Sequence, residues 1–358
     1  MALLLSCCPA SGEELARLDR NNLLQYRAAD GKILPVATAA EWQHRRAEIL
    51  RGMEAVMGRL PGGDRSAPPQ MKVQEEADVG PYVRRLISYQ SDPDSWATAY
   101  LCIPKDVLAG DRRAPAVLCL HPTDNTAGHK VVVDLGGRAN RQYAAELTER
   151  GYVTLSPSYP HLADYWPNLD RLGYVSGTMK AIWDNLRGLD LLASLPYVDS
   201  TRGFGAIGHS LGGHNSIYTA VFEPRISVVV SSCGFDSFLH YYDGAEGNWY
   251  FGKGWCQIRY MPLLSNYRGR LGEIPFDFPE LLGAIAPRPF FVNAPLRDSN
   301  FQARSVDQCA AAAAPIYELL GGPGRLIVQH PDCEHDFPDG MREEAYQLID
   351  SVLRPALR

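Results

Sequence analysis

The 358-residue sequence lacks the features that mark several large classes of protein. It has no run of about 20 apolar residues, the length that a membrane-spanning helix requires. It has no basic run that would neutralise a phosphate backbone, and its net charge at pH 7 is −6. None of its eight cysteines forms a Cys-x-x-Cys pair, so their spacing argues against a structural zinc site. We therefore expect no membrane span, no nucleic-acid partner and no metal.

The composition is that of a globular protein with a large core, because 46% of the residues are hydrophobic and 21% are charged. Free thiols behave as small hydrophobic groups, and three cysteines lie inside or beside apolar runs: Cys102, Cys119 and Cys233. This placement favours a cytoplasmic protein over a secreted one. A Cys309–Cys333 bridge remains an alternative, as does a trimmed signal peptide at residues 1–8, which are apolar but lack a positively charged start.

Short apolar runs alternate with helical patterns from residue 115 onward. The apolar runs are 115–120, 152–156, 203–208, 226–232, 289–293 and 325–329. The helical stretches are 137–150, 174–195, 211–222, 302–320 and 340–353. Such alternation predicts an α/β fold, with a mostly parallel central sheet covered by helices on both faces.

The region before this alternation divides into two parts. Residues 1–80 predict an N-terminal helical extension, because apolar residues recur at helical spacing over 40–58. Residues 81–358 then form the predicted catalytic domain. It begins with two strands, at 82–91 and 97–103, that we expect to add an antiparallel edge to the sheet.

An insertion at 237–285 interrupts the alternation and is rich in aromatic residues and glycine. Its position between two strands of the sheet predicts a cap or lid over the site. The alternative is a surface excursion that packs on its own aromatic side chains.

A candidate nucleophile stands between a predicted strand and a predicted helix, in the run Gly208-His209-Ser210-Leu211-Gly212. The pattern Gly-x-Ser-x-Gly holds the serine on a strained turn that exposes its hydroxyl at the sheet edge. Glycines on either side remove side chains that would collide where the backbone turns back. The helix that follows directs N–H groups towards developing negative charge. Ser210 is therefore the candidate nucleophile, and an ordinary strand-to-helix turn is the alternative.

A serine nucleophile needs a base, and the base needs an acid that orients it. In this setting the chain order is serine, then acid, then histidine. His335 lies in the loop after the last predicted strand and is the candidate base, with His330 as the alternative. Asp298 follows the strand 289–293 and is the candidate acid. Asp236 is the alternative acid, although its position also suits a helix N-cap.

The oxyanion of an acyl-transfer intermediate needs two N–H donors. Leu211 follows the nucleophile and is one candidate; Thr123 is the other, because Pro122 in the same loop has no N–H. The candidate substrate contacts come from loops expected at the same edge: His121, Tyr159, Trp166, Trp249 and Trp255. Three cations are either ligands for a substrate carboxylate or solvated surface charges: Arg297, Arg138 and Lys253.

These motifs resemble those of the α/β-hydrolase superfamily, and more narrowly its dienelactone-hydrolase and acetyl-xylan-esterase-like branch. The residues that carry the resemblance are Leu120-His121-Pro122-Thr123, Gly208-His209-Ser210-Leu211-Gly212-Gly213, Ala294-Pro295-Leu296-Arg297-Asp298 and Glu334-His335-Asp336-Phe337-Pro338. The resemblance implies a Ser210–His335–Asp298 triad, ester substrates, and a mechanism without metal or cofactor. The chain departs from dienelactone hydrolases, which carry a cysteine nucleophile, and from lipases, which have a His-Gly-Gly oxyanion run.

The sequence thus predicts a serine carboxylic-ester hydrolase that acts through an acyl-enzyme on acetylated carbohydrates or small aryl esters. A uronic-acid methyl esterase is the first alternative. A serine peptidase of prolyl-oligopeptidase type is the second, but about 80 residues before the first predicted sheet strand are too few for the propeller of such enzymes. A non-catalytic hydrolase-fold binding protein is the third, and the complete candidate triad argues against it. A dehalogenase or epoxide hydrolase would need a carboxylate at Ser210. The oligomeric state is not predicted.

Overall fold

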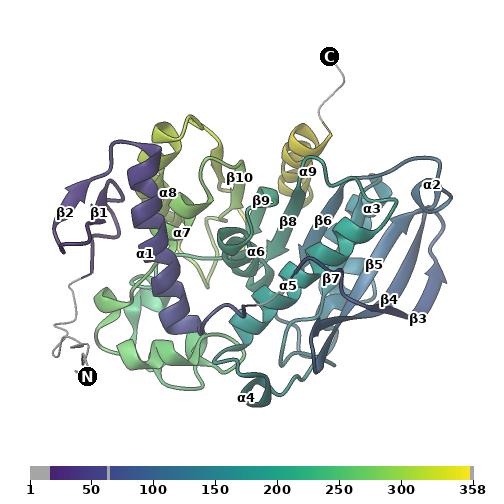
Figure 1. The fold of residues 1–358 in the computed structure, drawn as a ribbon, viewed down its shortest axis with the longest axis horizontal. Helices are drawn as coiled ribbons and strands as arrows, with labels where there is room; N and C mark the ends of the chain where they lie inside the picture. Colours follow the sequence, from purple (N-terminus) through teal and green to yellow (C-terminus); the bar gives the residue numbers. More distant parts are fainter. Residues whose placement is uncertain (1–16, 63–64, 355–358) are drawn as a thin grey trace, which may run out of the picture.

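The computed structural model describes residues 17–62 and 65–354, and a nine-stranded sheet forms its centre in the order β11-β10-β9-β8-β6-β7-β5-β4-β3 (Figure 1). The strands are β3 (Met71–Asp78), β4 (Tyr82–Asp92), β5 (Ser95–Pro104), β6 (Ala116–Leu120), β7 (Val153–Pro157), β8 (Phe204–His209), β9 (Ile226–Ser232), β10 (Phe290–Asn293) and β11 (Leu326–Gln329). The strands from β6 to β11 are parallel, and β3 to β5 form an antiparallel edge. The predicted fold class is confirmed.

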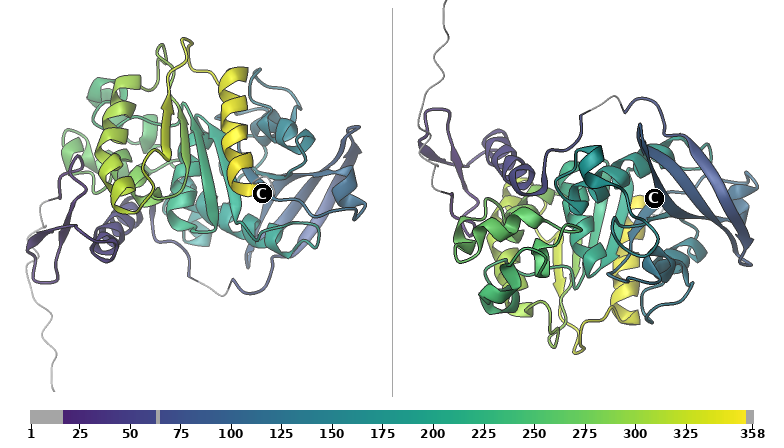
Figure 2. Two further views of the ribbon diagram at one scale, coloured as in Figure 1. Left: turned by 90° about the horizontal axis from the view of Figure 1, so that it is seen from above. Right: turned by 90° about the horizontal axis from the view of Figure 1, so that it is seen from below.

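Helices cover both faces of the sheet, as Figure 2 shows. The helices are α1 (Ala39–Met57), α2 (Lys105–Leu108), α3 (Tyr143–Glu149), α4 (Leu169–Leu172), α5 (Gly177–Ser194), α6 (Leu211–Phe222), α7 (Phe278–Ile285), α8 (Ala303–Leu319) and α9 (Asp339–Leu353). Side chains alternate along each strand, so β6 contributes Val117 to a core shared with α3 and α9, and Leu118 to a core shared with α5 and α6. The site at the strand ends therefore stands on two packed layers.

The N-terminal region contains the expected helix, observed as α1, with Thr38 and Glu41 forming a capping box at its start. A small hairpin of β1 (Gln25–Arg27) and β2 (Ile33–Pro35) precedes it. One boundary needs correction, because β3 lies inside the range 1–80 expected as extension and pairs with β4 in the main sheet. The pattern missed it since β3 is an exposed edge strand with almost no apolar alternation.

The insertion at 237–285 folds mostly into short 3₁₀ helices: η2 (Tyr241–Gly244), η3 (Glu246–Trp249), η4 (Gly254–Cys256), η5 (Pro262–Tyr267) and η6 (Leu271–Glu273). These turns surround Phe238, whose ring contacts those of Trp249 and Trp255. The insertion ends in α7, which is buried along its whole length and packs on α6 and α8. The segment thus packs on its own aromatic side chains and, through α7, on the main domain.

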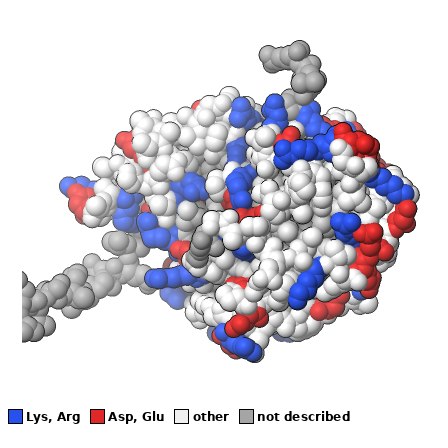
Figure 3. Space-filling model, turned by 45° about the vertical axis from the view of Figure 1, so that its right-hand side comes forward, with Lys and Arg blue, Asp and Glu red and all other residues white. Residues whose placement is uncertain are grey.

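Two further expectations concern membranes and disulfides. None of the described helices is both long enough and apolar enough to cross a membrane. All six cysteines in the described residues are free, including Cys309 and Cys333, whereas residues 1–8 lie outside the described part of the chain. On the face drawn in Figure 3, basic and acidic side chains are interspersed.

Candidate active site

Ser210 sits on a sharp turn between β8 and α6. Its backbone has φ 55° and ψ −117°, a conformation that non-glycine residues rarely adopt. A Cβ at Gly208 would lie 2.2 Å from the backbone of Gly212, and one at Gly212 would lie 1.9 Å from the carbonyl oxygen of Leu120. The two glycines of the motif are therefore needed for the backbone to pass at this distance, and the turn holds Ser210 at the carboxyl end of β8.

Both candidate oxyanion donors lie next to the nucleophile. Helix α6 begins at Leu211, so the first N–H groups of the helix have no acceptor within it. Thr123, in the loop after β6, lines the same cavities as Ser210, and its Oγ1 lies 2.9 Å from the hydroxyl of Tyr260. The structure thus places both residues predicted to supply the N–H donors next to Ser210.

His335 and Asp298 form a direct pair. The Nδ1 atom of His335 lies 2.9 Å from both carboxylate oxygens of Asp298, whose side chain is 1% exposed. The same carboxylate accepts hydrogen bonds from the backbone N–H groups of Asn300 and Phe301, which fix its orientation. Because a carboxylate only accepts, the imidazole carries its proton on Nδ1 and leaves Nε2 free to accept one. That tautomer is the one a general base requires.

The alternative base and acid are engaged elsewhere. His330 places Nδ1 2.7 Å from the carbonyl oxygen of Ala294 and Nε2 2.9 Å from Asp307. Asp236 is buried and accepts a hydrogen bond of 3.1 Å from the backbone N–H of Gln302, the residue that precedes α8. Burial raises the pKa of Asp236 to about 8, and the nearby carboxylates add to the effect. Asp236 therefore supports the residue that precedes α8, and it is not itself a helix N-cap, because no helix begins directly after it.

The loop that carries His335 is fixed by residues that the sequence analysis did not identify. Arg141 donates to the carbonyl oxygen of His335 at 3.1 Å and to Asp336 at 2.6 Å. Asn293, the last residue of β10, donates to the carbonyl oxygen of Asp336 at 2.9 Å. No sequence motif marks these two side chains, because their roles depend on loops that are distant in the chain.

A cluster of three potential metal ligands surrounds the base. Cys233, Asp298 and His335 offer ligand atoms that all lie within 4.8 Å of one another. A metal would need the Cys233 thiolate, yet burial raises the pKa of this thiol well above its usual value. It would also displace the hydrogen bond between Asp298 and His335. The cluster therefore fits an acid–base pair better than a metal site.

Ser210 lies between two cavities. One, of about 450 Å³, is here called the His335 cavity, and it is lined by Pro122, Thr123, Asp124, Asn125, Thr126, Val131, Arg138, Arg141, His209, Ser210, Asn300 and His335. The other, of about 160 Å³, is called the aromatic cavity, and it is lined by Thr123, Ser210, Leu211, His214, Tyr241, Tyr242, Gly254, Trp255, Gln257, Tyr260, Asn300 and Phe301. A bound ester can therefore extend from Ser210 in two directions.

Two hydrogen bonds tie the loop after β6 to the insertion at this point. One joins Thr123 to Tyr260, and in the other Arg259 donates to the side chain of Asn125 at 2.9 Å. The guanidinium of Arg259 also lies over the ring of Tyr260, 5.2 Å from its centre. The insertion thus forms a wall of the site, as expected of a cap.

Of the five predicted substrate contacts, only Trp255 lines a cavity at Ser210. His121 is buried, its Nε2 accepts from the backbone N–H of Tyr159 at 2.9 Å, and burial lowers its pKa to about 3. The hydroxyl of Tyr159 is likewise occupied, by Thr178 and the carbonyl oxygen of Arg259. These two residues hold adjacent loops together, so the expectation that they contact substrate is corrected.

The prediction of substrate contact is also corrected for the two remaining tryptophans, for opposite reasons. Trp249 is completely buried beside Phe238, and it lines neither cavity at Ser210. Trp166 is 67% exposed, stacks on His161 and donates its indole N–H to the carbonyl oxygen of Ala163. The contacts that the sequence analysis missed come from the same insertion and from the loop before α8: Tyr241, Tyr242, Gln257, Tyr260, Asn300 and Phe301. The four residues of the insertion had membership of an aromatic segment as their only signal, and Asn300 and Phe301 had none.

Of the three candidate cations for a substrate carboxylate, only one lines a cavity at Ser210. Arg138 lines the His335 cavity. Arg297 is 61% exposed and pairs with Asp332 at 3.2 Å, and Lys253 is exposed on the insertion; neither lines a cavity at Ser210.

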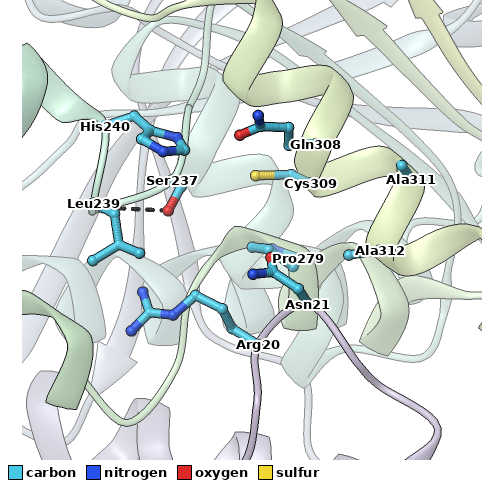
Figure 4. Close-up of a pocket in the computed structure, with 10 residues that line it drawn as sticks. All are labelled: Arg20, Asn21, Ser237, Leu239, His240, Pro279, Gln308, Cys309, Ala311 and Ala312. Carbon is cyan, nitrogen blue, oxygen red and sulfur yellow. Dashed lines mark hydrogen bonds between the residues drawn. The ribbon is translucent and has the colours of Figure 1, made fainter.

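A larger cavity, of about 520 Å³, lies away from this chemistry, between the N-terminal segment and α8 (Figure 4). The guanidinium of Arg20 in its wall is neutralised by Asp277 at 2.5 Å, and the thiol of Cys309 is buried. Neither Ser210 nor His335 reaches it. This cavity is larger than the two at Ser210, but it contains none of the candidate triad residues.

Comparisons with known proteins agree with this geometry. Residues 172–321 match the model of the family described as glucuronyl esterase, fungi. A 4-O-methyl-glucuronoyl methylesterase 1 from Wolfiporia cocos (strain MD-104) is 25% identical over 185 residues, which cover 48% of this chain and 45% of that protein. Its namesake from Sodiomyces alcalophilus is 28% identical over 167 residues, covering 43% and 33%. The chain therefore spans less than half the length of these curated relatives.

Solved structures extend the likeness over nearly the whole chain. A glucuronoyl esterase from Solibacter usitatus superposes with a TM-score of 0.71 at 19% identity, covering 95% of this chain and 99% of that one. Acetyl xylan esterase 1 from Thermoanaerobacterium sp. JW/SL YS485 gives a TM-score of 0.56 at 17% identity, covering 86% and 93%. The chain has the α/β-hydrolase fold that its motifs predicted, and its structural neighbours include acetyl xylan esterases.

Proposed function

We propose that the protein is a serine carboxylic-ester hydrolase that cleaves esters of uronic acids. The observation that carries this proposal is the pairing of His335 with Asp298 beside Ser210, at the junction of two cavities. The curated relatives are named as glucuronoyl methylesterases. Their names favour a uronate ester as the substrate over the acetylated carbohydrate that we expected first from the sequence. The same names favour an esterase over the peptidase and non-catalytic alternatives.

The proposed reaction has two balanced halves. The Ser210 Oγ attacks the ester carbonyl carbon while its proton passes to Nε2 of His335, and the oxyanion accepts hydrogen bonds from the N–H groups of Leu211 and Thr123. The carbon–oxygen bond to the alcohol then breaks, and His335 returns the proton to the departing oxygen. Water attacks the acyl-enzyme by the same route, which releases the carboxylic acid and restores Ser210. Asp298 stabilises the imidazolium in both halves.

The proposed reaction indicates which part of the ester would occupy each cavity. The departing oxygen must lie within reach of the proton on His335, so the alcohol part of the ester occupies the His335 cavity. The acyl part then occupies the aromatic cavity, which Leu211 lines and His335 does not. A volume of about 160 Å³ bounded by Trp255, Tyr260 and Gln257 provides ring faces and a few polar groups, as expected for one sugar ring.

An acetylated carbohydrate is the second candidate substrate, because acetyl xylan esterases are among the structural neighbours. In that case the acetyl group fills the aromatic cavity and the sugar occupies the larger one. The two candidates place the sugar on opposite sides of Ser210.

The deciding experiment compares methyl glucuronate with acetylated methyl glucoside, using titration of the released acid and Ser210→Ala as the control. We expect turnover of the uronate ester with kcat/KM at least about tenfold above that of the acetate, and none in the variant. Equal or faster turnover of the acetate would reverse the assignment. Turnover of neither ester, or turnover that survives in Ser210→Ala, would refute the proposed function.

A further inference from the structure

One positive charge in the His335 cavity has no counter-ion. Arg138 lies in the loop between η1 (Gly128–Val133) and α3, and it forms no ion pair or hydrogen bond with any residue that the structure describes. Its neighbour Arg141 differs, because its guanidinium is nearly buried and neutralised by Asp336 at 2.6 Å. The wall of the cavity therefore holds two cations. Arg141 is paired and ties the loops together, whereas Arg138 lines the cavity without a partner.

The carboxylates around this cavity are already engaged. Asp124 accepts hydrogen bonds from the backbone N–H groups of its own loop, at 2.9 and 2.7 Å. Asp336 accepts from Asn140 at 2.8 Å as well as from Arg141, and Asp298 is paired with His335. None of these carboxylates pairs with Arg138, so its guanidinium is open to a carboxylate of a ligand in the cavity.

The loop fixes the backbone around Arg138 at the wall of the cavity, whereas the side chain itself is exposed. A Cβ at Gly137 would lie 2.0 Å from Cγ2 of Val131, so the backbone just before Arg138 packs tightly on η1. After Arg138, the side chain of Asn140 is tied to Asp336. The charge of Arg138 also acts on the imidazole of His209, the residue preceding the nucleophile, and it is the smallest contribution to lowering the pKa of His209, after burial, Arg141 and His335. Arg138 is thus anchored on both sides and within electrostatic reach of the Ser210 turn.

We propose that Arg138 is an anion subsite for the leaving group, which selects esters whose alcohol part carries a carboxylate. The inference rests on the proposed function, because the transfer of a proton from His335 is what places the alcohol part in this cavity. The carboxylate itself does not react: the alcohol departs with the proton from His335 and keeps its negative charge throughout. A guanidinium suits this role, since it can pair with a carboxylate through two parallel hydrogen bonds.

The test uses two esters of glucuronic acid that differ by one charge, the benzyl ester and the 4-carboxybenzyl ester. The quantity measured is the ratio of kcat/KM for the charged ester to that for the neutral one. The neutral ester reports any general effect of a substitution, so the ratio isolates the charge. We expect Arg138→Ala to lower this ratio about two- to fivefold, mainly through the KM of the charged ester, as is typical of a solvent-accessible ion pair. Arg138→Lys should restore part of the ratio.

Arg202→Ala is the matched control, because Arg202 is also exposed but stands before β8, at the opposite end of that strand from Ser210. Raising the salt concentration should lower the ratio in the wild type and leave it unchanged in Arg138→Ala. The inference is overturned if Arg138→Ala keeps the wild-type ratio, or if Arg202→Ala lowers it equally. Failure of the wild type to cleave either ester refutes the proposed function, whereas equal cleavage of both refutes the anion subsite alone.

Discussion

The pairing of Asp298 with His335 makes Asp298→Asn the most informative substitution. Both carboxylate oxygens lie 2.9 Å from Nδ1 of His335, so the carboxylate accepts the Nδ1 proton and fixes the tautomer. An amide of the same shape keeps an oxygen for the N–H groups of Asn300 and Phe301, but it then turns its NH₂ group towards His335. That donor favours the tautomer with the proton on Nε2, which cannot accept the proton of Ser210.

The expected loss in kcat is about 10⁴-fold, the size found when the acid of a serine triad becomes an amide. Each factor of ten is about 1.4 kcal/mol, so the loss corresponds to about 5.5 kcal/mol of transition-state stabilisation. The measurement is kcat on methyl glucuronate, together with thermal unfolding to show that the variant is folded. We expect a small change in stability, because the carbonyl oxygen of the amide replaces the accepting oxygen.

Asp236→Asn provides the matched control, because it changes the alternative acid in the same way. This side chain accepts from the N–H of Gln302, and its raised pKa of about 8 keeps it protonated at neutral pH. An amide there preserves both the charge and the acceptor, so we expect activity within about threefold of the wild type. Retention of more than a tenth of the activity in Asp298→Asn would refute the assignment of the acid. A loss in Asp236→Asn as large as in Asp298→Asn would do the same.

Three further predictions concern the turn, the wall of the site and the dependence of stability on pH. Gly212→Ala should lower the free energy of unfolding, measured by urea titration, by about 3 kcal/mol, because its Cβ would lie 1.9 Å from the last carbonyl oxygen of β6. Gly340→Ala is the control and should leave this free energy unchanged, because the space around Gly340 is open. Tyr260→Phe should lower kcat about two- to tenfold, because it removes the hydrogen bond that positions Thr123. An unchanged kcat would show that the loop after β6 needs no such support. Stability should fall as the pH drops from about 6.5 towards 3, since the unfolded chain takes up protons that the buried histidines refuse, among them His121 with a pKa of about 3. His121→Gln should reduce that slope in part, and a slope unchanged by the substitution would contradict the reasoning.

The sheet could be predicted because its strands are buried on both faces. Such strands are continuous apolar runs, and the predicted run 226–232 coincides with β9. Strand β3 escaped prediction for the converse reason: an edge strand that buries almost nothing carries no apolar signal. The predicted helix over 137–150 is shorter in the structure, where α3 occupies only Tyr143–Glu149, because the two glycines before Arg138 have positive φ.

The pairing of the candidate acid and base could be predicted for a topological reason. Strands β10 and β11 are parallel neighbours, and their last residues, Asn293 and Gln329, are directly paired. The loops after them therefore begin at the same level of the sheet edge, and a carboxylate on one reaches a histidine on the other. Chain order and strand ends predict a carboxylate and a histidine at this edge, and the hydrogen bonds of the structure then select Asp298 over Asp236 and His335 over His330.

The substrate contacts obey no such rule, and the tryptophans of the insertion show why. Trp249 and Trp255 are the same residue type in the same irregular segment, and both touch the ring of Phe238. One is sealed in the core, whereas the other borders the aromatic cavity. A long helix or strand has a period that tells which side chains share a face, but separate 3₁₀ turns of three to six residues keep no common period along the segment. The proposed substrate contacts of the aromatic cavity therefore come mostly from the part of the chain whose side-chain directions sequence periodicity cannot give. Experiments on Arg138 and Tyr260 are accordingly better guides to the natural ester than any further motif.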